Sequence, residues 1–366
     1  MPVRSAGFVL TPSKKTEYSL THEYRIRTTL LIFAKNEAFM TTHGADLLIE
    51  AIDAKANPCV VGLDPRVSQL PDEIRKSAIA EYGNTIEGTA KAIEFFCIEV
   101  INHVKDIVAI VKPQIAFFEQ YGSHGIAAFE RVLQYAHQEN LLVITDAKRN
   151  DIGSTCEAYA RAHLGTVELI GDSMRGTPEK NRTSTPHRCD WLTVSPYLGS
   201  DGIDPFIEII QDKPQGIFVL VKTSNPSAGE FQDITTGRGE PLWQSVASMV
   251  KTKGSEHLGN RGYSTVGAVV GATYPDEARV LRQHMPRTIF LVPGYGAQGG
   301  NADSIVDTFQ RDGYGAIVNA SRSILYAFRN APSTEPWTKA VRDATVAMRD
   351  DVIGSLKKHG KLPAQW

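Results

Sequence analysis

The charged side chains best suited to chemistry lie within residues 141–155, directly after an uncharged apolar run. That run, residues 141–145, predicts a buried strand, and Asp146, Lys148 and Asp151 follow it within six positions. Side chains two positions apart on an extended chain share a face, so Asp146 and Lys148 are expected to point the same way. Charges at the end of a buried strand are costly unless they pair or take part in a reaction. The segment therefore predicts a reaction centre, with Asp151 in the loop just beyond the strand.

Two further ionisable side chains follow other apolar runs and are expected to join this centre. Asp64 comes directly after the first run of the sequence, and Lys112 directly after the second. Together with Asp146, Lys148 and Asp151 they would form an array of alternating carboxylates and ammonium groups, in which opposite charges keep each group ionised. Lys148 would then be a cation near neutral pH, which suits a proton donor rather than a Schiff-base amine. A purely structural network of ion pairs is the alternative.

Segments after later apolar runs could bind the phosphate and the polar edge of a ligand. Residues 294–300 contain four glycines, which permit positive φ and the close backbone approach that amide binding of phosphate requires. Arg322 follows the next run and could add charged, bidentate hydrogen bonds to the same group. Ser224, after the fifth run, could contact a polar edge. The plainer alternatives are a flexible loop, a surface arginine and a turn serine.

These residues need a scaffold that brings the ends of many strands together, and the apolar pattern predicts one. Eight short apolar runs alternate with amphipathic segments such as residues 125–139 and 276–284, and each run is continuous, as in strands covered on both faces. Eight β/α units over about 300 residues favour a single (β/α)8 TIM barrel, whose active sites lie at the carboxyl ends of the strands. A doubly wound sheet is the alternative. The runs are residues 59–63, 107–111, 141–145, 191–195, 217–221, 266–271, 288–292 and 316–319.

Composition excludes several classes of partner. The 366 residues are 42% hydrophobic and carry a net charge of −2, which allows a full core and gives no basic field for nucleic acid. No run approaches the roughly 18 apolar residues of a membrane helix. Without a recognisable secretory signal, a cytoplasmic location is expected.

Two segments fall outside the repeating pattern. Residues 1–39 show no sustained period, and we expect an extension that is poorly ordered or lies upstream of the true start. The barrel domain would then occupy residues 40–366. Residues 171–188 are rich in Thr, Pro, Arg and Ser and predict a long insertion before the fourth strand.

Several segments together resemble the orotidine 5′-phosphate decarboxylase family. Residues 146–155, Asp-Ala-Lys-Arg-Asn-Asp-Ile-Gly-Ser-Thr, are similar to its D-x-K-x-x-D signature and match the subgroup that has D-A-K-R-x-D-I-G. Two positions depart from the family pattern, Asn150 in place of a frequent glycine and Ser195 in place of an expected asparagine, and neither is ionisable. Further similar segments occur in the family's order at residues 62–66, 112–114, 223–226, 293–300 and 318–323.

The resemblance implies a lyase that needs no metal or other cofactor. The family removes CO₂ from orotidine 5′-monophosphate to give UMP, the last step of de novo pyrimidine biosynthesis. Lys148 would protonate C6 of the pyrimidine as the carboxylate leaves, and Asp146 would sit against that carboxylate. Asp64 and Lys112 would hold the ribose hydroxyls, with Lys112 also bracing Asp146.

The resemblance also implies a homodimer with composite active sites. In the family, the residues that match Asp151, Ile152 and Thr155 enter the site of the neighbouring subunit, with Asp151 among the catalytic groups. Ser224 would contact the pyrimidine amide edge, and Gln298 would link the base to the phosphate. Arg322 would bind the phosphate.

Two other functions remain open at this stage. One is a Mg²⁺-dependent 3-keto-sugar-phosphate decarboxylase or hexulose-phosphate synthase, which shares the D-x-K-x-x-D motif but uses a strand-two glutamate for its metal. Here that strand ends in Lys112, a cation that would repel Mg²⁺. The other is a catalytically silent nucleotide-binding or scaffold protein, which would be expected to lose at least one member of the ionic array.

Overall fold

The computed structural model describes residues 43–178, 182–211, 213–296, 302–332 and 334–366. The predicted extension over residues 1–39 and Gln298 lie outside these ranges, and the predicted phosphate-binding segment 294–300 is described only as far as residue 296. Within the ranges, no helix combines the length and the apolar character needed to cross a membrane.

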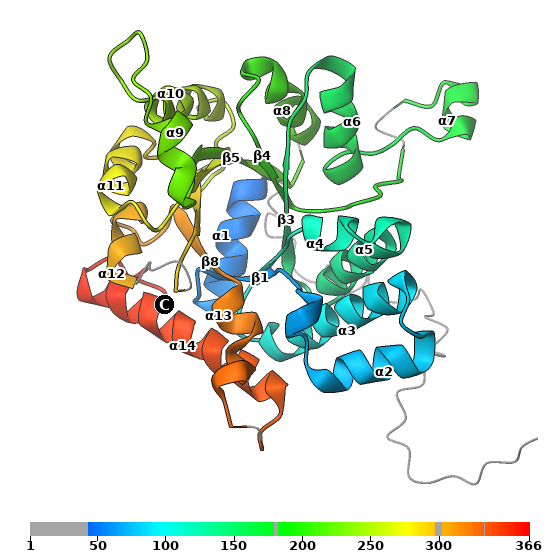
Figure 1. The fold of residues 1–366 in the computed structure, drawn as a ribbon. Helices are drawn as coiled ribbons and strands as arrows, with labels where there is room; N and C mark the ends of the chain where they lie inside the picture. The colour runs from blue at the N-terminus through cyan, green and yellow to red at the C-terminus, as the bar shows by residue number, and fades with distance from the viewer. Residues whose placement is uncertain (1–42, 179–181, 212, 297–301, 333) are drawn as a thin grey trace, which may run out of the picture. The chain divides into compact units, whose positions relative to one another are not determined.

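Eight parallel strands form a closed barrel in which each strand pairs with the next along the chain and the last pairs with the first (Figure 1). This closed order confirms the (β/α)8 TIM barrel and rules out the open, doubly wound sheet. The strands are β1 (Cys59–Leu63), β2 (Ile110–Pro113), β3 (Leu142–Arg149), β4 (Trp191–Val194), β5 (Gly216–Lys222), β6 (Ser264–Val270), β7 (Thr288–Pro293) and β8 (Ala316–Ala320).

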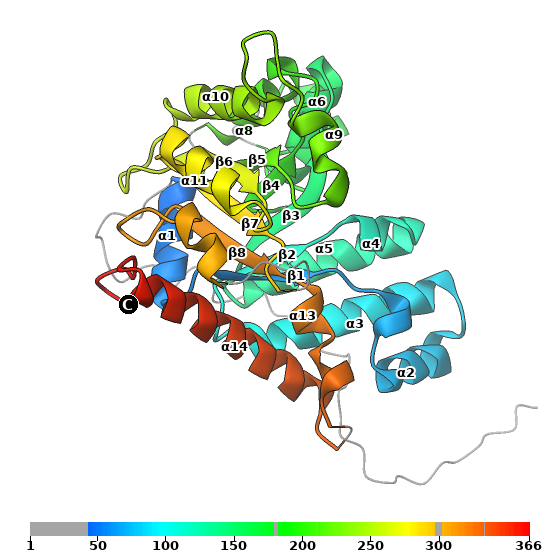
Figure 2. The ribbon, with the colours of Figure 1, turned by 60° about the vertical axis from the view of Figure 1, so that its left-hand side comes forward.

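Helices surround the barrel and cover the outer face of its strands (Figures 1 and 2). The predicted insertion over residues 171–188 lies between the sixth helix and β4, and the seventh helix is in this connection (Figure 1). The helices are α1 (Gly44–Lys55), α2 (Asp72–Tyr82), α3 (Ile86–Val104), α4 (Ala116–Glu119), α5 (Gly122–Gln138), α6 (Gly153–His163), α7 (Ile170–Arg175), α8 (Asp204–Ile210), α9 (Gly229–Gln232), α10 (Leu242–Gly254), α11 (Pro275–His284), α12 (Ala302–Ile305), α13 (Arg322–Leu325) and α14 (Trp337–Lys358).

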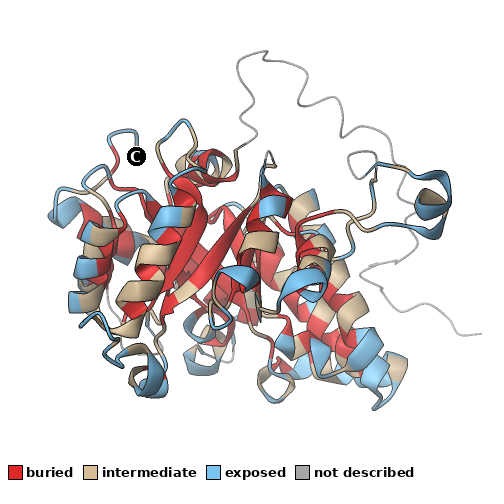
Figure 3. Cartoon of the chain, turned by 90° about the horizontal axis from the view of Figure 1, so that it is seen from above, coloured by how far each residue is buried: buried red, intermediate tan, exposed pale blue. Residues whose placement is uncertain are grey.

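The strands form because their continuous apolar runs can be covered on both faces. Every residue of β1, β6 and β8 is buried, and Figure 3 shows the buried strands at the centre with exposed residues on the outer helices. One apolar cluster fills the layer between strands and helices. A second lies inside the barrel, where the rings of Trp191 and Phe218 stack with centroids 4.5 Å apart.

Helix α1 closes the amino end of the barrel. Its residues Leu48, Ile49 and Ile52 are buried in the same cluster as the interior side chains. The Asp46 carboxylate in its first turn accepts hydrogen bonds from the backbone amides of Asn260 and Arg261, at 2.7 and 2.9 Å, which anchors α1 to the loop before β6. The carboxyl end of the barrel is left for the polar segments.

The predicted strand boundaries lie within two residues of the observed ones except at two strands, β2 and β3. The apolar pattern predicts the second strand at residues 107–111, but β2 begins at Ile110. Ile107 and Val108 are buried in the turn after α3, where both amides bond to the Val104 carbonyl, so their apolar character reflects burial and not a strand. The third strand is longer than predicted, because β3 continues through the charged residues to Arg149.

Candidate active site

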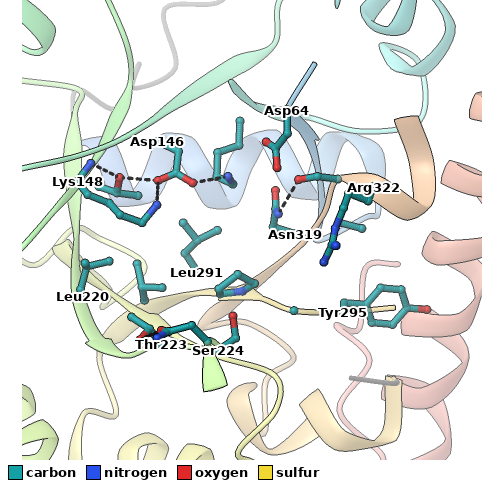
Figure 4. Close-up of a pocket in the computed structure, with 18 of the residues that line it drawn as sticks. Asp64, Asp146, Lys148, Leu220, Thr223, Ser224, Leu291, Tyr295, Asn319 and Arg322 are labelled. Carbon is teal, nitrogen blue, oxygen red and sulfur yellow. Dashed lines mark hydrogen bonds and ion pairs between the residues drawn. The ribbon is translucent and has the colours of Figure 1, made fainter. Parts of the chain in front are cut away.

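A cavity of about 460 Å³ opens at the carboxyl end of the barrel (Figure 4). The residues that line it come from the ends of several strands, as the barrel predicts. Six of the predicted site residues lie together on its wall, namely Asp64, Lys112, Asp146, Lys148, Ser224 and Arg322.

Asp146 is the centre of this site. Its Oδ2 accepts a hydrogen bond from Lys112 Nζ at 2.7 Å, and its Oδ1 accepts one from Lys148 Nζ at 2.6 Å. The hydroxyl of Thr193 on β4 also donates to Oδ1, at 3.0 Å. Asp146 is only 8% exposed, so a buried carboxylate is held between two ammonium groups from neighbouring strands.

The two lysines decide the charge of this carboxylate. Burial alone would raise the pKa of Asp146, but the charges and hydrogen bonds of Lys112 and Lys148 outweigh it and hold that pKa well below its usual range. Burial would likewise lower the pKa of Lys112, yet attraction to Asp146 and Asp64 raises it above its ordinary value. Asp146 and Lys112 are therefore both ionised near neutral pH.

The two lysines differ in their access to the cavity. The Lys112 side chain is 5% exposed, whereas that of Lys148 is 47% exposed. Lys148 also has φ of +50°, in the left-handed region that non-glycine residues rarely adopt. Lys112 is thus a buried structural partner of Asp146, while Lys148 presents its ammonium group to whatever occupies the cavity.

Asp64, directly after β1, offers a free acceptor to the cavity. Within the described residues, its buried Oδ1 has no hydrogen-bond partner, and the same holds for Oδ1 of Asn319 on β8. The Tyr326 hydroxyl donates to the Asp64 carbonyl at 2.8 Å and fixes the end of β1. Buried acceptors without partners are costly, so these two are suited to hydroxyl groups of a ligand.

A glycine makes room for this wall. A Cβ atom at Gly62 would lie 1.9 Å from the Ser321 hydroxyl and 3.1 Å from Asn319 Oδ1. Any side chain at position 62 would therefore displace Ser321 and Asn319, which line the cavity at and just after the end of β8.

The far end of the cavity is suited to an anion. Arg322 is exposed there, and no carboxylate of the described chain forms an ion pair with it. Gly294 has φ of +100°, so the turn after β7 adopts a conformation that favours glycine. The Tyr295 hydroxyl donates to the Asp351 carboxylate on α14 and ties this turn to the outer layer. Gln298 lies outside the described residues.

Three predicted site residues lie away from the cavity of their own chain. Asp151 accepts a hydrogen bond from the Ile152 amide at 2.8 Å, and within the described residues it makes no ion pair with Lys148. Ile152 is 54% exposed and Thr155 is also exposed. The array within one chain therefore consists of Asp64, Lys112, Asp146 and Lys148, without Asp151.

Sequence reasoning missed two polar residues of the site, Thr193 and Asn319. Each stands near the carboxyl end of a predicted strand and is almost fully buried, at 1% and 6% exposure. The available signal was a polar side chain inside an otherwise apolar run of a barrel, where it costs free energy unless it has a partner.

Replacing Lys112 and Lys148 separately should change the free energy of unfolding by different amounts, because the two side chains differ in burial. We expect Lys112→Met to lower the free energy of unfolding by about 3 kcal/mol, because it removes the fully buried one of the two ammonium groups that pair with the Asp146 carboxylate. Lys148→Met should cost less than about 1 kcal/mol, because a half-exposed ion pair contributes little. Urea unfolding of both variants at pH 7 measures the difference, and equal losses would contradict the assigned burial.

Comparison with known proteins places these residues in a family. Residues 91–331 match the family described as Orotidine 5'-phosphate decarboxylase / HUMPS. The orotidine 5'-phosphate decarboxylase of Rhodopirellula baltica is 46% identical over 299 residues, covering 80% of this chain and 93% of the relative. That of Caldicellulosiruptor bescii is 38% identical over 286 residues, covering 78% and 90%.

A solved structure agrees with these relatives. Leishmania donovani OMP decarboxylase superposes with a TM-score of 0.61 at 28% identity, over 86% of this chain and 98% of that chain. With the matched segment, the extensive identity and the shared barrel, the chain belongs to the orotidine 5′-phosphate decarboxylase / HUMPS family.

Proposed function

We propose that this protein decarboxylates orotidine 5′-monophosphate to UMP and CO₂, the last step of pyrimidine biosynthesis. The observation that carries the proposal is the ionised Asp146 between Lys112 and Lys148 at the wall of the cavity. Relatives named for this activity are up to 46% identical to the chain. The proposed reaction needs a fixed negative charge beside the leaving carboxylate and a proton donor beside C6, and this pair supplies both.

The proposed reaction balances with these groups alone. The bond between C6 and the carboxylate breaks, its electron pair stays on C6, and CO₂ leaves. The Lys148 ammonium then transfers a proton to C6, which gives UMP and a neutral amine that solvent reprotonates. Lys148 is a suitable donor because it is half exposed to the cavity while its Nζ remains bonded to Asp146.

Asp146 contributes to the rate by repelling the substrate carboxylate. At about 4 Å and an effective dielectric constant near 20, two like charges repel by about 4 kcal/mol. That corresponds to about three orders of magnitude in rate if the repulsion is relieved in the transition state. Stabilisation of the developing C6 carbanion by the fixed Lys148 ammonium is the second and larger contribution.

The rest of the cavity would hold the nucleotide. Asp64 and Lys112 would bind the ribose hydroxyls, since the Asp64 carboxylate has an unpartnered oxygen within the described residues. Arg322 would bind the phosphate, and Ser224 the amide edge of the base. Binding of the remote phosphate would help position the base against the charged pair. Gln298 is assigned to base and phosphate by the sequence resemblance alone.

We also propose that the active enzyme is a homodimer with shared sites. Asp151, Ile152 and Thr155 do not line the cavity of their own chain, and Ile152 is an exposed apolar side chain at the rim of the barrel. Burying Ile152 against a second copy would remove apolar surface from water. The same contact would bring Asp151 to the site of the partner.

The Mg²⁺-dependent sugar-phosphate reaction of the same superfamily fits the site less well. Lys112 occupies the end of β2 and donates to Asp146, so the ammonium group stands where a metal ligand would be needed. Within the described residues, no cluster of three or more His, Cys, Asp or Glu side chains is arranged to hold a metal ion. A silent nucleotide-binding protein is distinguished by turnover.

The proposed activity can be followed through the ultraviolet absorbance of orotidine 5′-monophosphate in excess EDTA. We expect the wild type to consume the substrate and Lys148→Ala to lose at least about 10²–10⁴-fold in kcat, because the proton donor is removed. Lys339→Ala, at an exposed lysine on α14, is the matched control and should retain full activity. Folded wild type without turnover would overturn the proposal, and sugar phosphates with Mg²⁺ would be tried next.

Subunit sharing can be tested by combining two inactive chains. In a heterodimer of Lys148→Ala and Asp151→Ala chains, one site would carry both substitutions and the other would carry neither. Purified heterodimers with two different tags should therefore regain about half of the wild-type kcat per dimer, from one intact site in two. No recovery would show that Asp151 does not act across the interface.

A further inference from the structure

The pairing of β3 with β4 is interrupted at the charged residues. The ladder is regular up to Thr145 and resumes at Arg149. Three consecutive residues of β3, among them Asp146 and Lys148, therefore lie opposite a single residue of β4, Thr193. Extra residues in one strand of a pair form a bulge, which leaves backbone groups without their ladder partners and redirects side chains.

The Thr193 hydroxyl takes the place of the missing ladder partners. Its Oγ1 accepts hydrogen bonds from the backbone amides of Ala147 and Lys148, each at 3.0 Å. It donates its own proton to Asp146 Oδ1, also at 3.0 Å. A hydroxyl has one donor and two acceptor positions, so all three are used by consecutive residues of β3. At 1% exposure, Thr193 has no competing contact with bulk water.

This hydroxyl restrains the backbone of Lys148 directly and its ammonium group through Asp146. The backbone of Lys148 is in the left-handed region, with φ of +50°, a conformation that persists only where surrounding contacts fix it. One of those contacts is the hydrogen bond that the Lys148 backbone amide donates to the Thr193 hydroxyl. The far end of the same side chain bonds to Asp146 Oδ1, the oxygen that also accepts the Thr193 proton.

We propose that Thr193 is a positioning residue, whose hydroxyl holds Lys148 and Asp146 in the orientation that the reaction requires. The inference rests on the proposed decarboxylation and extends it from the charged groups to the strand beside them. Thr193 would not exchange a proton with the substrate. It acts by fixing the bulge. The ammonium group of Lys148 then already points to the place that C6 of the substrate would occupy.

The contact of another buried threonine, Thr345, shows the difference between a hydroxyl that is only hydrogen-bonded and one that also positions other groups. Thr345 on α14 donates to the carbonyl of Val341, one turn earlier in its own helix, at 2.8 Å. Such a bond satisfies a hydroxyl and positions nothing else. All three bonds of Thr193 instead lead to the segment that carries the two charged groups.

Thr193→Val and Thr193→Ser separate the hydroxyl from the shape of the side chain. Valine keeps the volume and removes all three hydrogen bonds, whereas serine keeps them. We expect Thr193→Val to lower kcat by about 10–100-fold, since small misplacements of reacting groups have effects of this size. KM and the Kd of UMP should change less than about threefold, because the phosphate and ribose contacts are untouched. Serine should restore kcat to within about threefold of the wild type.

Thr265→Val is the matched control. Thr265 is also a buried strand threonine, 4% exposed, but it lies near the amino end of β6, far along the strand from the cavity. We expect its kcat to equal that of the wild type. Thermal unfolding of all variants separates misplacement of the pair from general loss of stability.

The outcomes are distinct. Wild type without turnover would refute the proposed function, whereas an active wild type with an equally active Thr193→Val would refute the positioning role alone. A fall in kcat that serine does not restore, or that is matched by an equal rise in KM, would also overturn it. If Thr193→Val does not fold, Thr193→Ala is measured in the same way. Failure of both to fold would assign the hydroxyl to stability and reject the proposal.

Discussion

The structure of the site depends on one interaction, the pairing of the Asp146 carboxylate with two ammonium groups. This pairing keeps a negative charge on a side chain that is almost completely buried. Burial by itself would raise the pKa of Asp146, and the charges and hydrogen bonds of the two ammonium groups in contact with it outweigh that effect. Each lysine is in turn held by the strand that carries it. Lys112 is buried at the end of β2, and Lys148 is turned toward the same carboxylate by a bulge in β3.

The closed barrel makes this arrangement possible. Parallel strands direct all of their carboxyl ends to one rim, so charged residues far apart in the sequence meet there without long loops. Helix α1 covers the opposite end with apolar side chains and leaves the rim for the polar ones. Asp64 and Arg322 also line the cavity, and in the proposed function they would bind the hydroxyl groups and the phosphate of the nucleotide.

The barrel and the positions of its charged residues could largely be predicted from the sequence, because both follow from local patterns of apolar and charged residues. Asp146, Lys148 and Lys112 each follow an apolar run, and a barrel brings such positions together. The bulge was not predictable, because it depends on how β3 is registered against β4, and Thr193 alone looks like part of an apolar strand. The position of Asp151 outside the cavity of its own chain could not be predicted from its spacing to Lys148. The D-x-K-x-x-D spacing would be the same whether Asp151 contributed to its own cavity or to that of a second subunit.

The ionisation of Asp146 can be measured directly by ¹³C NMR of carboxyl-labelled aspartate, with Asp146→Asn to assign its signal. We expect the signal to stay at the position of an ionised carboxylate from about pH 8 down to about pH 4, where an ordinary aspartate is already half protonated. The lowered pKa caused by Lys112 and Lys148 requires this result. A titration midpoint at or above about pH 4 would contradict it, because the two lysines would then not outweigh the cost of burial.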